Sequence, residues 1–473
     1  MSAIPPVFVE SPCPCAWRGS RYDFYPPAEH FQRSFGEAAF RQAANVSNED
    51  PIPRRLTLSV RLPRCSGNCS TFPGKRNLAH DDTRADRYLA HLEREMAMAA
   101  TLFYRDREVV QLHLDGNATD FLGTGRLGEL MENLHRHFQA GVATDLAIEI
   151  DPQSVSSDDI EALAFMGFNR AHIRAQDICP GVRLATDSLQ PVHAYTATIE
   201  ALRRERFRSV TVAVMHGLPG QKREGFARFL DGVLAARPDR VAIRDYPPLP
   251  QGFRSHGRLG EPGLSSGHDR LGLLLLAIGK LAAAGYRCIG MGEFCLPTDE
   301  LALAQERGCL YRNLTGYTVL GETDQIGFGI GAISRIGDNY AQNLSDPASW
   351  EAAIDGGRLP VWRGLRLGGD DVLRSELIQQ LMCYGRIEKR VLETRHRIDF
   401  DEYFAEDLRR LQPLASAGLV ECAADSIRAR DDGRLLHWLV AACFDAYLQR
   451  EDRKTRWLSR AARIAAMRPD LDQ

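Results

Sequence analysis

Short apolar runs alternate with amphipathic segments through the first two thirds of the chain. The runs are typical of buried strands and occupy residues 56–62, 109–114, 146–150, 171–175, 209–215 and 240–246. Segments with apolar residues at helical spacing follow them, at residues 83–103, 125–138, 157–166, 192–206, 223–236 and 268–284. These strand–helix units predict an α/β fold, in which a parallel sheet with helices outside curls into a complete or partial (β/α)6 barrel.

The pattern changes on both sides of this barrel. Residues 1–55 are irregular and interrupted by prolines, which predicts an N-terminal arm. Another strand is expected at Tyr286–Phe294, and glycine-rich Gly316–Gly337 is expected to border the barrel mouth as loop and short strand. Helical spacing then returns, and helices with a hairpin at 419–429 resemble a winged-helix module. We therefore predict an arm (1–55), a barrel with an extension (56–366) and a C-terminal, mostly helical, winged-helix-like domain (367–473).

Composition places the chain among ordinary globular proteins. It has 473 residues, 44% of them hydrophobic and 26% charged, with a formal net charge of −3. A charge so close to zero argues against a nucleic-acid partner, and we interpret the C-terminal module as a lid over the barrel. The longest apolar stretch is too short to span a bilayer, and eleven scattered cysteines fit reduced thiols better than a disulfide framework. We therefore expect a cytoplasmic protein with no membrane partner.

Polar residues follow the predicted strands at their C-terminal ends, where barrels of this type carry their chemistry. We expect them to ring one mouth of the barrel: Cys65, Cys69, Asp115 to Asp120, Glu149, Asp151, Gln176, Asp177, His216 and Gly217. Each also has a structural interpretation, since an aspartate after a strand often caps a helix and a histidine often packs in a core.

Two cysteine pairs and one aromatic segment suggest binding chemistry. Cys65 and Cys69, four residues apart after the first strand, provide half of a metal site. A second pair, Cys13 and Cys15, lies in the arm. Residues 18–26, RGSRYDFYP, combine Arg18, Arg21 and Tyr22 with further aromatic rings. This segment is either a surface arm pinned by its aromatic residues or a substrate-binding arm, because guanidinium groups bind carboxylates bidentately.

Several longer motifs are shared with a known family. They are RYDFYP at 21–26, AIEIDP at 147–152, GFNR at 167–170, GLP at 217–219, DELALAQERG at 299–308, RNLTGYTVLGETD at 312–324, IGFGIGAIS at 326–334 and IGDNYAQN at 336–343. In these motifs the chain resembles the oxygen-independent coproporphyrinogen III oxidases, radical S-adenosylmethionine (SAM) enzymes of haem biosynthesis. The resemblance runs from about Arg18 to about Arg463. It implies a radical-SAM-type partial barrel and a tetrapyrrole partner.

The resemblance also implies an iron–sulfur site that this chain does not fully reproduce. The family motif is C-x3-C-x2-C, because three thiolates leave one iron of a [4Fe–4S] cluster free to chelate SAM. Cys65 and Cys69 hold the first two positions, but Phe72 holds the third, and a phenyl ring cannot ligate iron. We therefore predict a divergent member whose metal-ligand candidates are Cys65 and Cys69, with Cys13 or Cys15 as a replacement for the missing thiolate.

The SAM-binding positions implied by the resemblance are largely changed as well. The family's glycine-rich stretch after the second strand is replaced by residues 115–119, and changes also occur at Ser59, Arg61, Ala213, Asp187 or Ser188, Leu314 and Thr315. Glu149 and Gln176 are retained. The cofactor-binding candidates are therefore Glu149, Gln176, Asp115 and Gly116, and no catalytic residue is assigned.

Two functions follow as hypotheses. The first is a pseudoenzyme of tetrapyrrole metabolism that binds porphyrin or haem but has lost radical-SAM catalysis. Arg18 and Arg21 would meet its propionates, and the Cys-Pro pairs at Cys13 and Cys179 or the histidines His113, His172 and His216 would ligate haem iron. The alternative is an active oxidase that converts propionate side chains to vinyl groups with SAM and a [4Fe–4S] cluster completed by an N-terminal cysteine.

Overall fold

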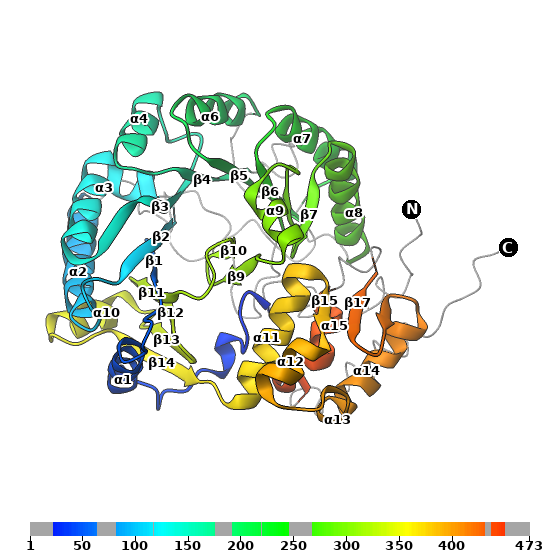
Figure 1. Ribbon diagram of the computed structural model, residues 1–473. Helices are drawn as coiled ribbons and strands as arrows, with labels where there is room; N and C mark the ends of the chain where they lie inside the picture. Colours follow the sequence, from blue (N-terminus) through cyan, green and yellow to red (C-terminus); the bar gives the residue numbers. More distant parts are fainter. Residues whose placement is uncertain are drawn as a thin grey trace.

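The frame of the molecule is a β-sheet whose central strands are parallel and curve into a partial ring in the computed structural model (Figure 1). The structure describes residues 22–63, 82–116, 118–175, 192–218, 220–245, 267–430 and 437–449. The parallel strands, in their order across the sheet, are β11 (Asp324–Phe328), β1 (Leu56–Arg61), β2 (Glu108–Asp115), β3 (Gln139–Ile150), β4 (Arg170–Ala175), β5 (Ser209–His216) and β6 (Arg240–Asp245). The predicted parallel α/β sheet is confirmed.

Helices cover the outer face of this sheet, as Figure 1 shows around its left and upper edges. They are α2 (Asp82–Ala100), α3 (Ala118–His137), α4 (Ser157–Phe165), α6 (Val192–Arg204), α7 (Arg223–Ala235) and α8 (Gly267–Ala283). α3 is interrupted at Gly123, whose φ of 70° and ψ of 167° are not helical, so the sequence prediction of a helix from Gly125 matches its main part. The partial barrel therefore has one face packed on helices and one face turned to its centre.

Alternation along each strand sorts the side chains between these two faces. In β1, Leu56, Leu58 and Val60 belong to the core that the sheet shares with the helices. Thr57 and Ser59 consequently point to the barrel centre. The same alternation in the other parallel strands turns a mixture of polar and small or apolar side chains to that centre, among them Glu149, His172, Thr211 and Ala213.

Additional strands extend the sheet at both ends. Next to β11 lie the antiparallel strands β12 (Ile333–Ile336), β13 (Asn339–Asn343) and β14 (Val361–Arg366), and next to β6 lie β8 (Glu293–Cys295) and β7 (Arg287–Gly290). The single strand expected at Tyr286–Phe294 is thus a hairpin. Its turn contains Gly290 and Gly292, both with positive φ, and a Cβ on Gly292 would lie 2.5 Å from the carbonyl oxygen of Ile243.

A separate hairpin lies inside the curve of the sheet, and a short helix lies near the ends where the parallel strands begin. Strands β9 (Tyr311–Asn313) and β10 (Gly316–Thr318) pair with each other inside the curve of the sheet (Figure 1). Helix α9 (Glu300–Arg307) begins at Asp299, whose side chain accepts a hydrogen bond from Leu301 N–H, and ends at Gly308 in the left-handed region. Part of the stretch expected to border the mouth is therefore ordered strand structure.

The N-terminal segment contains a helix that the sequence prediction of an irregular arm missed. Helix α1 (Glu37–Asn48) buries Phe40, Ala43 and Ala44, which recur at helical spacing. A 3-10 turn, η3 (Ala28–His30), precedes it. The prolines before residue 28 and after residue 50 masked the short periodic segment between them. The predicted domain boundary at residue 55 stays a prediction.

The C-terminal part has its own hydrophobic core. Its elements, after α10 (Pro347–Asp355), are α11 (Gly369–Tyr384), β15 (Arg386–Glu388), α12 (Lys389–His396), α13 (Phe400–Tyr403), α14 (Ala405–Ser416), β16 (Val420–Cys422), β17 (Ser426–Ala429) and α15 (His437–Phe444). The three short strands form one antiparallel sheet, and Tyr22 and Tyr25 from the N-terminal segment join this core. Among the helices described, none combines the length and apolar character needed to cross a bilayer.

Candidate functional site

A network of ion pairs closes the barrel at the ends where its strands begin. Arg170 on β4 contacts Asp145 at 2.9 Å and Glu300 at 2.7 Å, and Arg240 on β6 contacts Glu300 at 2.8 Å and Asp299 at 2.8 Å. Burial raises the pKa of Glu300, but the two guanidinium groups more than offset this, so its pKa lies below the ordinary value. We call this group of ion pairs the charged floor of the barrel. Its role is structural, because barrels of this type carry their chemistry at the opposite end, where the strands end.

Two histidines meet above this floor on the inner face. The rings of His113 on β2 and His172 on β4 are edge to face, with centroids 5.2 Å apart. Burial, followed by the nearby His113 and several arginines, lowers the pKa of His172 well below its ordinary value. His172 is therefore neutral near pH 7 and turned to the barrel interior.

The upper rim brings together three of the predicted cofactor-binding residues. β2 ends at Asp115, and Gly116 turns the chain with a φ of 90°. The N–H of Gly116 donates to Glu149 Oε2 at 3.3 Å, and Glu149 Oε1 pairs with Arg174 at 2.7 Å. The Leu62 N–H donates to the Asp115 carbonyl at 2.9 Å and joins the end of β1 to this group. The carboxylate of Glu149 is thus held between a backbone amide and a guanidinium group.

One residue expected at the mouth, His216, faces away from the barrel centre. His216 follows Val210, Val212 and Val214 in the alternation of β5, so it faces the helices and not the barrel centre. Burial lowers its pKa, and its Nδ1 lies 3.8 Å from Asp245 Oδ1. The expectation that His216 lies on the inner rim with His113 and His172 is therefore wrong.

Asp151 follows directly on the last residue of β3, at the strand end where the sequence placed it. Its side chain accepts a hydrogen bond from the N–H of Gln153 at 2.9 Å, which gives it the local turn role that the sequence left open.

Several candidates fall outside the described residues, so their positions stay predictions. They are Cys13, Cys15, Arg18, Arg21, Cys65, Cys69, Phe72, Gln176, Asp177, Cys179, Asp187 and Ser188. Six other cysteines are described and all are free thiols. Burial raises the pKa of Cys295, Cys383 and Cys443 to about 12, so these thiols stay protonated near neutral pH. Within the described parts of the chain, no three histidine, cysteine or acidic side chains gather as metal ligands.

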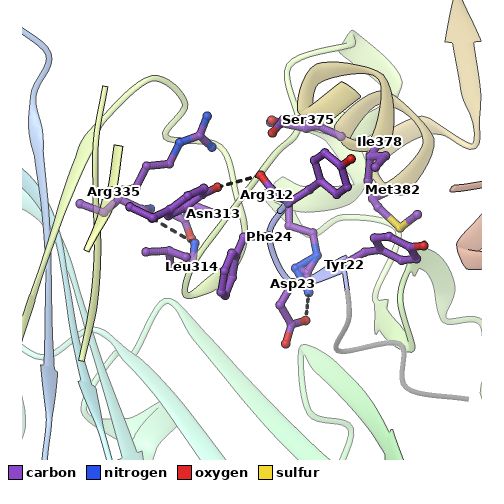
Figure 2. A pocket seen from close by; sticks show the side chains of 14 residues that line it. Tyr22, Asp23, Phe24, Arg312, Asn313, Leu314, Arg335, Ser375, Ile378 and Met382 are labelled. Carbon is purple, nitrogen blue, oxygen red and sulfur yellow. Dashed lines mark hydrogen bonds and ion pairs between the residues drawn. The ribbon is translucent and has the colours of Figure 1, made fainter. Parts of the chain in front are cut away.

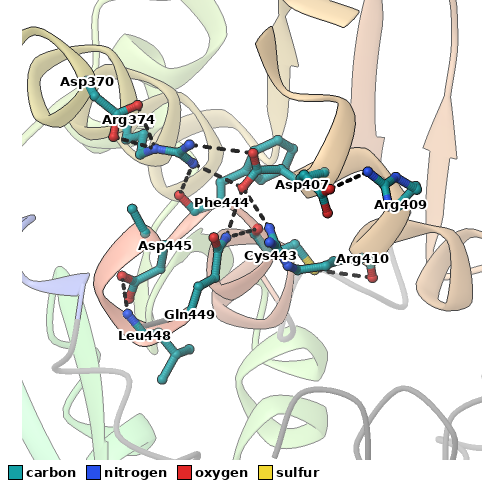
Figure 3. A network of polar contacts seen from close by, with 12 residues as sticks. Asp370, Arg374, Asp407, Arg409, Arg410, Cys443, Phe444, Asp445, Leu448 and Gln449 are labelled. Carbon is teal, nitrogen blue, oxygen red and sulfur yellow. Dashed lines mark hydrogen bonds and ion pairs between the residues drawn. The ribbon is translucent and has the colours of Figure 1, made fainter. Parts of the chain in front are cut away.

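Tyr22, the described member of the predicted substrate-binding group, belongs to a buried network between the two ends of the chain. Its hydroxyl donates to Asp445 Oδ2 at 3.2 Å, and the Ala446 N–H donates to the Tyr25 hydroxyl at 3.1 Å. Figure 3 shows the neighbouring contacts, in which Arg374 donates to Asp407 at 3.0 Å and to the Phe444 carbonyl at 2.8 Å. This network fixes the start of the described chain against the C-terminal core.

A pocket that sequence analysis missed lies where this N-terminal segment, the sheet extension and α11 meet (Figure 2). Its free volume is about 30 Å³, and its walls are Tyr22, Asp23, Phe24, Tyr25, Arg312, Asn313, Leu314, Gln325, Arg335, Tyr340, Ser375, Ile378, Gln379 and Met382. Asn313 Nδ2 donates to Gln111 Oε1 on the inner face of β2 at 3.1 Å, so one wall of the pocket reaches the barrel centre. Two arginines and several aromatic rings make this pocket suited to an anionic, partly aromatic ligand.

Comparisons with known proteins agree in one direction. An oxygen-independent coproporphyrinogen III oxidase of Pseudomonas aeruginosa is 37% identical, over 91% of this chain and 94% of that protein. One from Escherichia coli K12 is 36% identical, over 92% and 94%. A solved structure of the Escherichia coli coproporphyrinogen III oxidase, described as a radical SAM enzyme, superposes with a TM-score of 0.85 at 36% identity and covers 91% of this chain and 98% of that one. No protein-family model matches the chain.

Proposed function

Because this chain belongs to the family of oxygen-independent coproporphyrinogen III oxidases, we propose that it binds a tetrapyrrole of the coproporphyrinogen class and oxidises it. The observation that carries this proposal is the superposition, with a TM-score of 0.85, on a coproporphyrinogen III oxidase over nearly the full length of both chains. The comparisons thereby favour the active oxidase over the pseudoenzyme hypothesis. The cytoplasmic location remains a prediction.

The inner face of the barrel suits a substrate with several carboxylates. Arg174 on β4 pairs with Glu149 at the rim, and Arg312 on the central hairpin pairs with Asp23, so two guanidinium groups lie at different places around the interior. Guanidinium groups bind carboxylates through paired hydrogen bonds, which orient as well as attract them. In this proposal Arg18, Arg21 and Tyr22 add a further contact from the N-terminal segment.

The implied [4Fe–4S] cluster and SAM have to be tested against the side chains of this chain. The three family positions supply two thiolates, from Cys65 and Cys69, and the phenyl ring of Phe72. Among the described residues, no three metal-ligating side chains gather at one point. At the rim, Glu149 is already engaged by Arg174 and Gly116. This ligand set does not fit a cluster held by three cysteines, so no reaction step is assigned through the cluster here.

In this proposal Cys13 or Cys15 supplies the third thiolate beside Cys65 and Cys69. Cys15 lies seven residues before Tyr22, and an extended segment of that length spans at most about 25 Å. The described anchor at Tyr22 therefore limits how far Cys15 and Cys13 can reach from the C-terminal core. Both cysteines remain candidates for the third thiolate.

A second candidate function is favoured by the same substitution. With Phe72 at the third ligand position, the chain would act as a catalytically silent binder of porphyrin or haem. Its tetrapyrrole would still be held by the basic side chains of the interior. The two candidates share the ligand and differ in the chemistry.

Anaerobic reconstitution with iron and sulfide separates them. An active oxidase should bind about four irons and four sulfides per chain and cleave SAM to 5′-deoxyadenosine, and C65S and C69S should abolish both. If the cluster forms, C13S and C15S test whether the arm completes it. A chain that binds coproporphyrin III but takes up no stoichiometric cluster supports the silent binder and contradicts the oxidase. Failure to bind any tetrapyrrole contradicts both.

A further inference from the structure

The pocket of Figure 2 carries a cationic side chain that no carboxylate of the described chain neutralises. Arg335 on β12 lies opposite Gln325 of β11 and opposite Tyr340 of β13, in register across three strands. Its guanidinium carbon is 5.5 Å from the centroid of the Tyr340 ring. Among the described residues, no aspartate or glutamate forms an ion pair with Arg335, whereas Arg174 and Arg312 each have one. An arginine left in this way in a concave site is available to an anionic ligand.

A second arginine on the opposite wall has spare hydrogen-bonding capacity. Arg312 on β9 pairs with Asp23 at 2.5 Å through Nη2, and its guanidinium carbon lies 5.2 Å from the centroid of the Tyr317 ring. Its side chain is only 10% exposed. Its Nε is buried and finds no hydrogen-bond partner among the described residues. A buried N–H without an acceptor is costly, and an oxygen atom of a bound ligand would satisfy it.

Aromatic and apolar surface lies between these two cationic groups. Phe24 packs against Tyr340 with centroids 5.2 Å apart, and Leu314 and Met382 add apolar walls. The side chain of Gln325 is engaged on the hairpin, where Leu314 N–H donates to Gln325 Oε1 at 3.1 Å. These side chains form an apolar surround in which a carboxylate would be attracted to the guanidinium groups.

From this arrangement we infer that the pocket is a subsite for the carboxylate of one propionate of the tetrapyrrole, with Arg335 as the residue that binds the carboxylate and Arg312 as its support. The inference rests on the proposed tetrapyrrole ligand and deepens it. Its free volume of about 30 Å³ holds about two water molecules, which suits the carboxylate end of one propionate and leaves the pyrrole ring outside the pocket. The hydrogen bond from Asn313 to Gln111 joins the subsite to the barrel centre, where the rest of the macrocycle would lie.

The subsite also gives a reason for the firm anchoring of the N-terminal segment. Asp23 and Phe24 form one of its walls, and their neighbours Tyr22 and Tyr25 are tied to Asp445 and Ala446. Asp23 is the counter-ion of Arg312, so it keeps that guanidinium group in place. Arg312 is therefore a positioning and binding group whose geometry depends on the arm, whereas Arg335 depends only on the sheet.

Fluorescence titration of the full-length chain with coproporphyrin III tests the inference. The comparison ligand is coproporphyrin III tetramethyl ester in the same detergent buffer, which has the same ring without the negative charges. The variant R335M removes the charge and keeps the length of the side chain. The matched control is R33M, because Arg33 lies 5.7 Å over the Trp362 ring outside the pocket. Circular dichroism melting checks that both variants fold as the parent does.

We expect R335M to weaken coproporphyrin III binding by about tenfold to a hundredfold, the loss typical of one charge-assisted contact, and to leave ester binding unchanged. R335K should recover part of the affinity, and R33M should behave as the parent. Equal binding of coproporphyrin III by R335M and the parent would overturn the subsite while leaving the proposed function standing. Equal losses for the acid and the ester would overturn it too, because the effect would then not be one of charge.

Three further outcomes separate the subsite from an amino-acid site and from the oxidase proposal. If SAM or methionine displaces coproporphyrin III from the parent but not from R335M, the pocket binds an amino-acid carboxylate and the inference is wrong. If coproporphyrin III binding depends on Arg335 while the reconstituted chain oxidises nothing, the subsite stands and the oxidase proposal fails. If the parent binds no coproporphyrin III, both fail together.

Discussion

The buried carboxyl group of Glu95 makes a strong prediction about pH dependence. Glu95 on α2 is 2% exposed and accepts hydrogen bonds from Gly329 N–H at 2.9 Å, Asn343 Nδ2 at 2.6 Å and Trp350 Nε1 at 3.2 Å. Among the described residues it has no cationic partner. Burial raises its pKa from 4.5 to about 7, against the three donated hydrogen bonds, which lower it.

The sign of the effect follows from proton linkage. Between pH 4.5 and about 7, folded chains hold a proton on Glu95 that unfolded chains have lost, so the free energy of unfolding falls as the pH rises through this window. At 1.36 kcal/mol per pKa unit, the shift corresponds to about 3 kcal/mol. The contribution is fully present below about pH 4.5 and absent above about pH 7.

The substitution E95Q removes the titrating group and keeps its size. Urea denaturation, followed by tryptophan fluorescence and circular dichroism, gives the free energy of unfolding of the parent and of E95Q at pH 5 and at pH 8. The quantity compared is the change in that free energy between the two pH values, in the parent and in the variant. We expect the parent to lose about 3 kcal/mol more than E95Q between these two pH values. The control E93Q changes a carboxylate of the same helix that is paired at the surface with Arg136, and it should keep the parent's pH dependence. The same pH dependence in E95Q and the parent would refute the reasoning.

Gly329 connects Glu95 to the end of β1 at the rim of the barrel. A Cβ on Gly329 would lie 2.5 Å from the carbonyl oxygen of Arg61, the last residue of β1, and Arg61 Nη1 donates to the Gly331 carbonyl at 3.0 Å. Glu95 therefore holds the backbone that packs against the end of β1, four residues before Cys65. Ionisation of Glu95 should loosen this support.

Three further predictions concern other parts of the chain. The variant D324N removes the negative charge that lies 2.7 Å from the guanidinium of Arg107, a side chain 2% exposed, and should lower the free energy of unfolding by about 3–5 kcal/mol in urea denaturation. A loss below about 1 kcal/mol would contradict the importance of this ion pair. The variant R374M should accelerate amide hydrogen exchange in α14 and α15, because Arg374 joins these helices to α11 in the C-terminal core, and it should leave the barrel strands protected. Acceleration throughout the chain would contradict the separation of the two hydrophobic cores. The variant F72C restores the C-x3-C-x2-C spacing and should raise iron uptake on anaerobic reconstitution to about four iron atoms per chain. The control F72S should not raise it, and equal iron content in the two variants would show that position 72 is not a ligand position.

Local patterns were enough for the barrel and for part of its rim. Each strand–helix unit is specified by the spacing of apolar residues within a few turns, so the parallel sheet could be predicted without knowledge of distant contacts. The rule that strand ends share one edge placed Asp115, Gly116 and Glu149 together, and the structure has Gly116 and Glu149 in contact. His216 was misplaced although the signal was present, because Val210, Val212 and Val214 already show which face of β5 is buried.

Helix α1 and the sheet extension were missed for a different reason. α1 is short and lies between proline-rich stretches, so its periodicity covers too few turns to stand out. Strands β12 to β14 follow glycine-rich sequence, and their pairing beside β11 depends on contacts with β1, which precedes them by more than 250 residues. Register of this kind is set by long-range packing and not by local propensity.

The sequence by itself determined the fold class, the family and the replacement of a thiol by Phe72, since these depend on residue identity and local spacing. Only the tertiary structure decided which side chains meet. Arg335 and Arg312 face one pocket with Asp23 and Phe24, and Glu95 is buried against Gly329 and Trp350. These groups come from segments far apart in the chain. Their charge states and partners follow from burial and distance, which are properties of the folded chain alone.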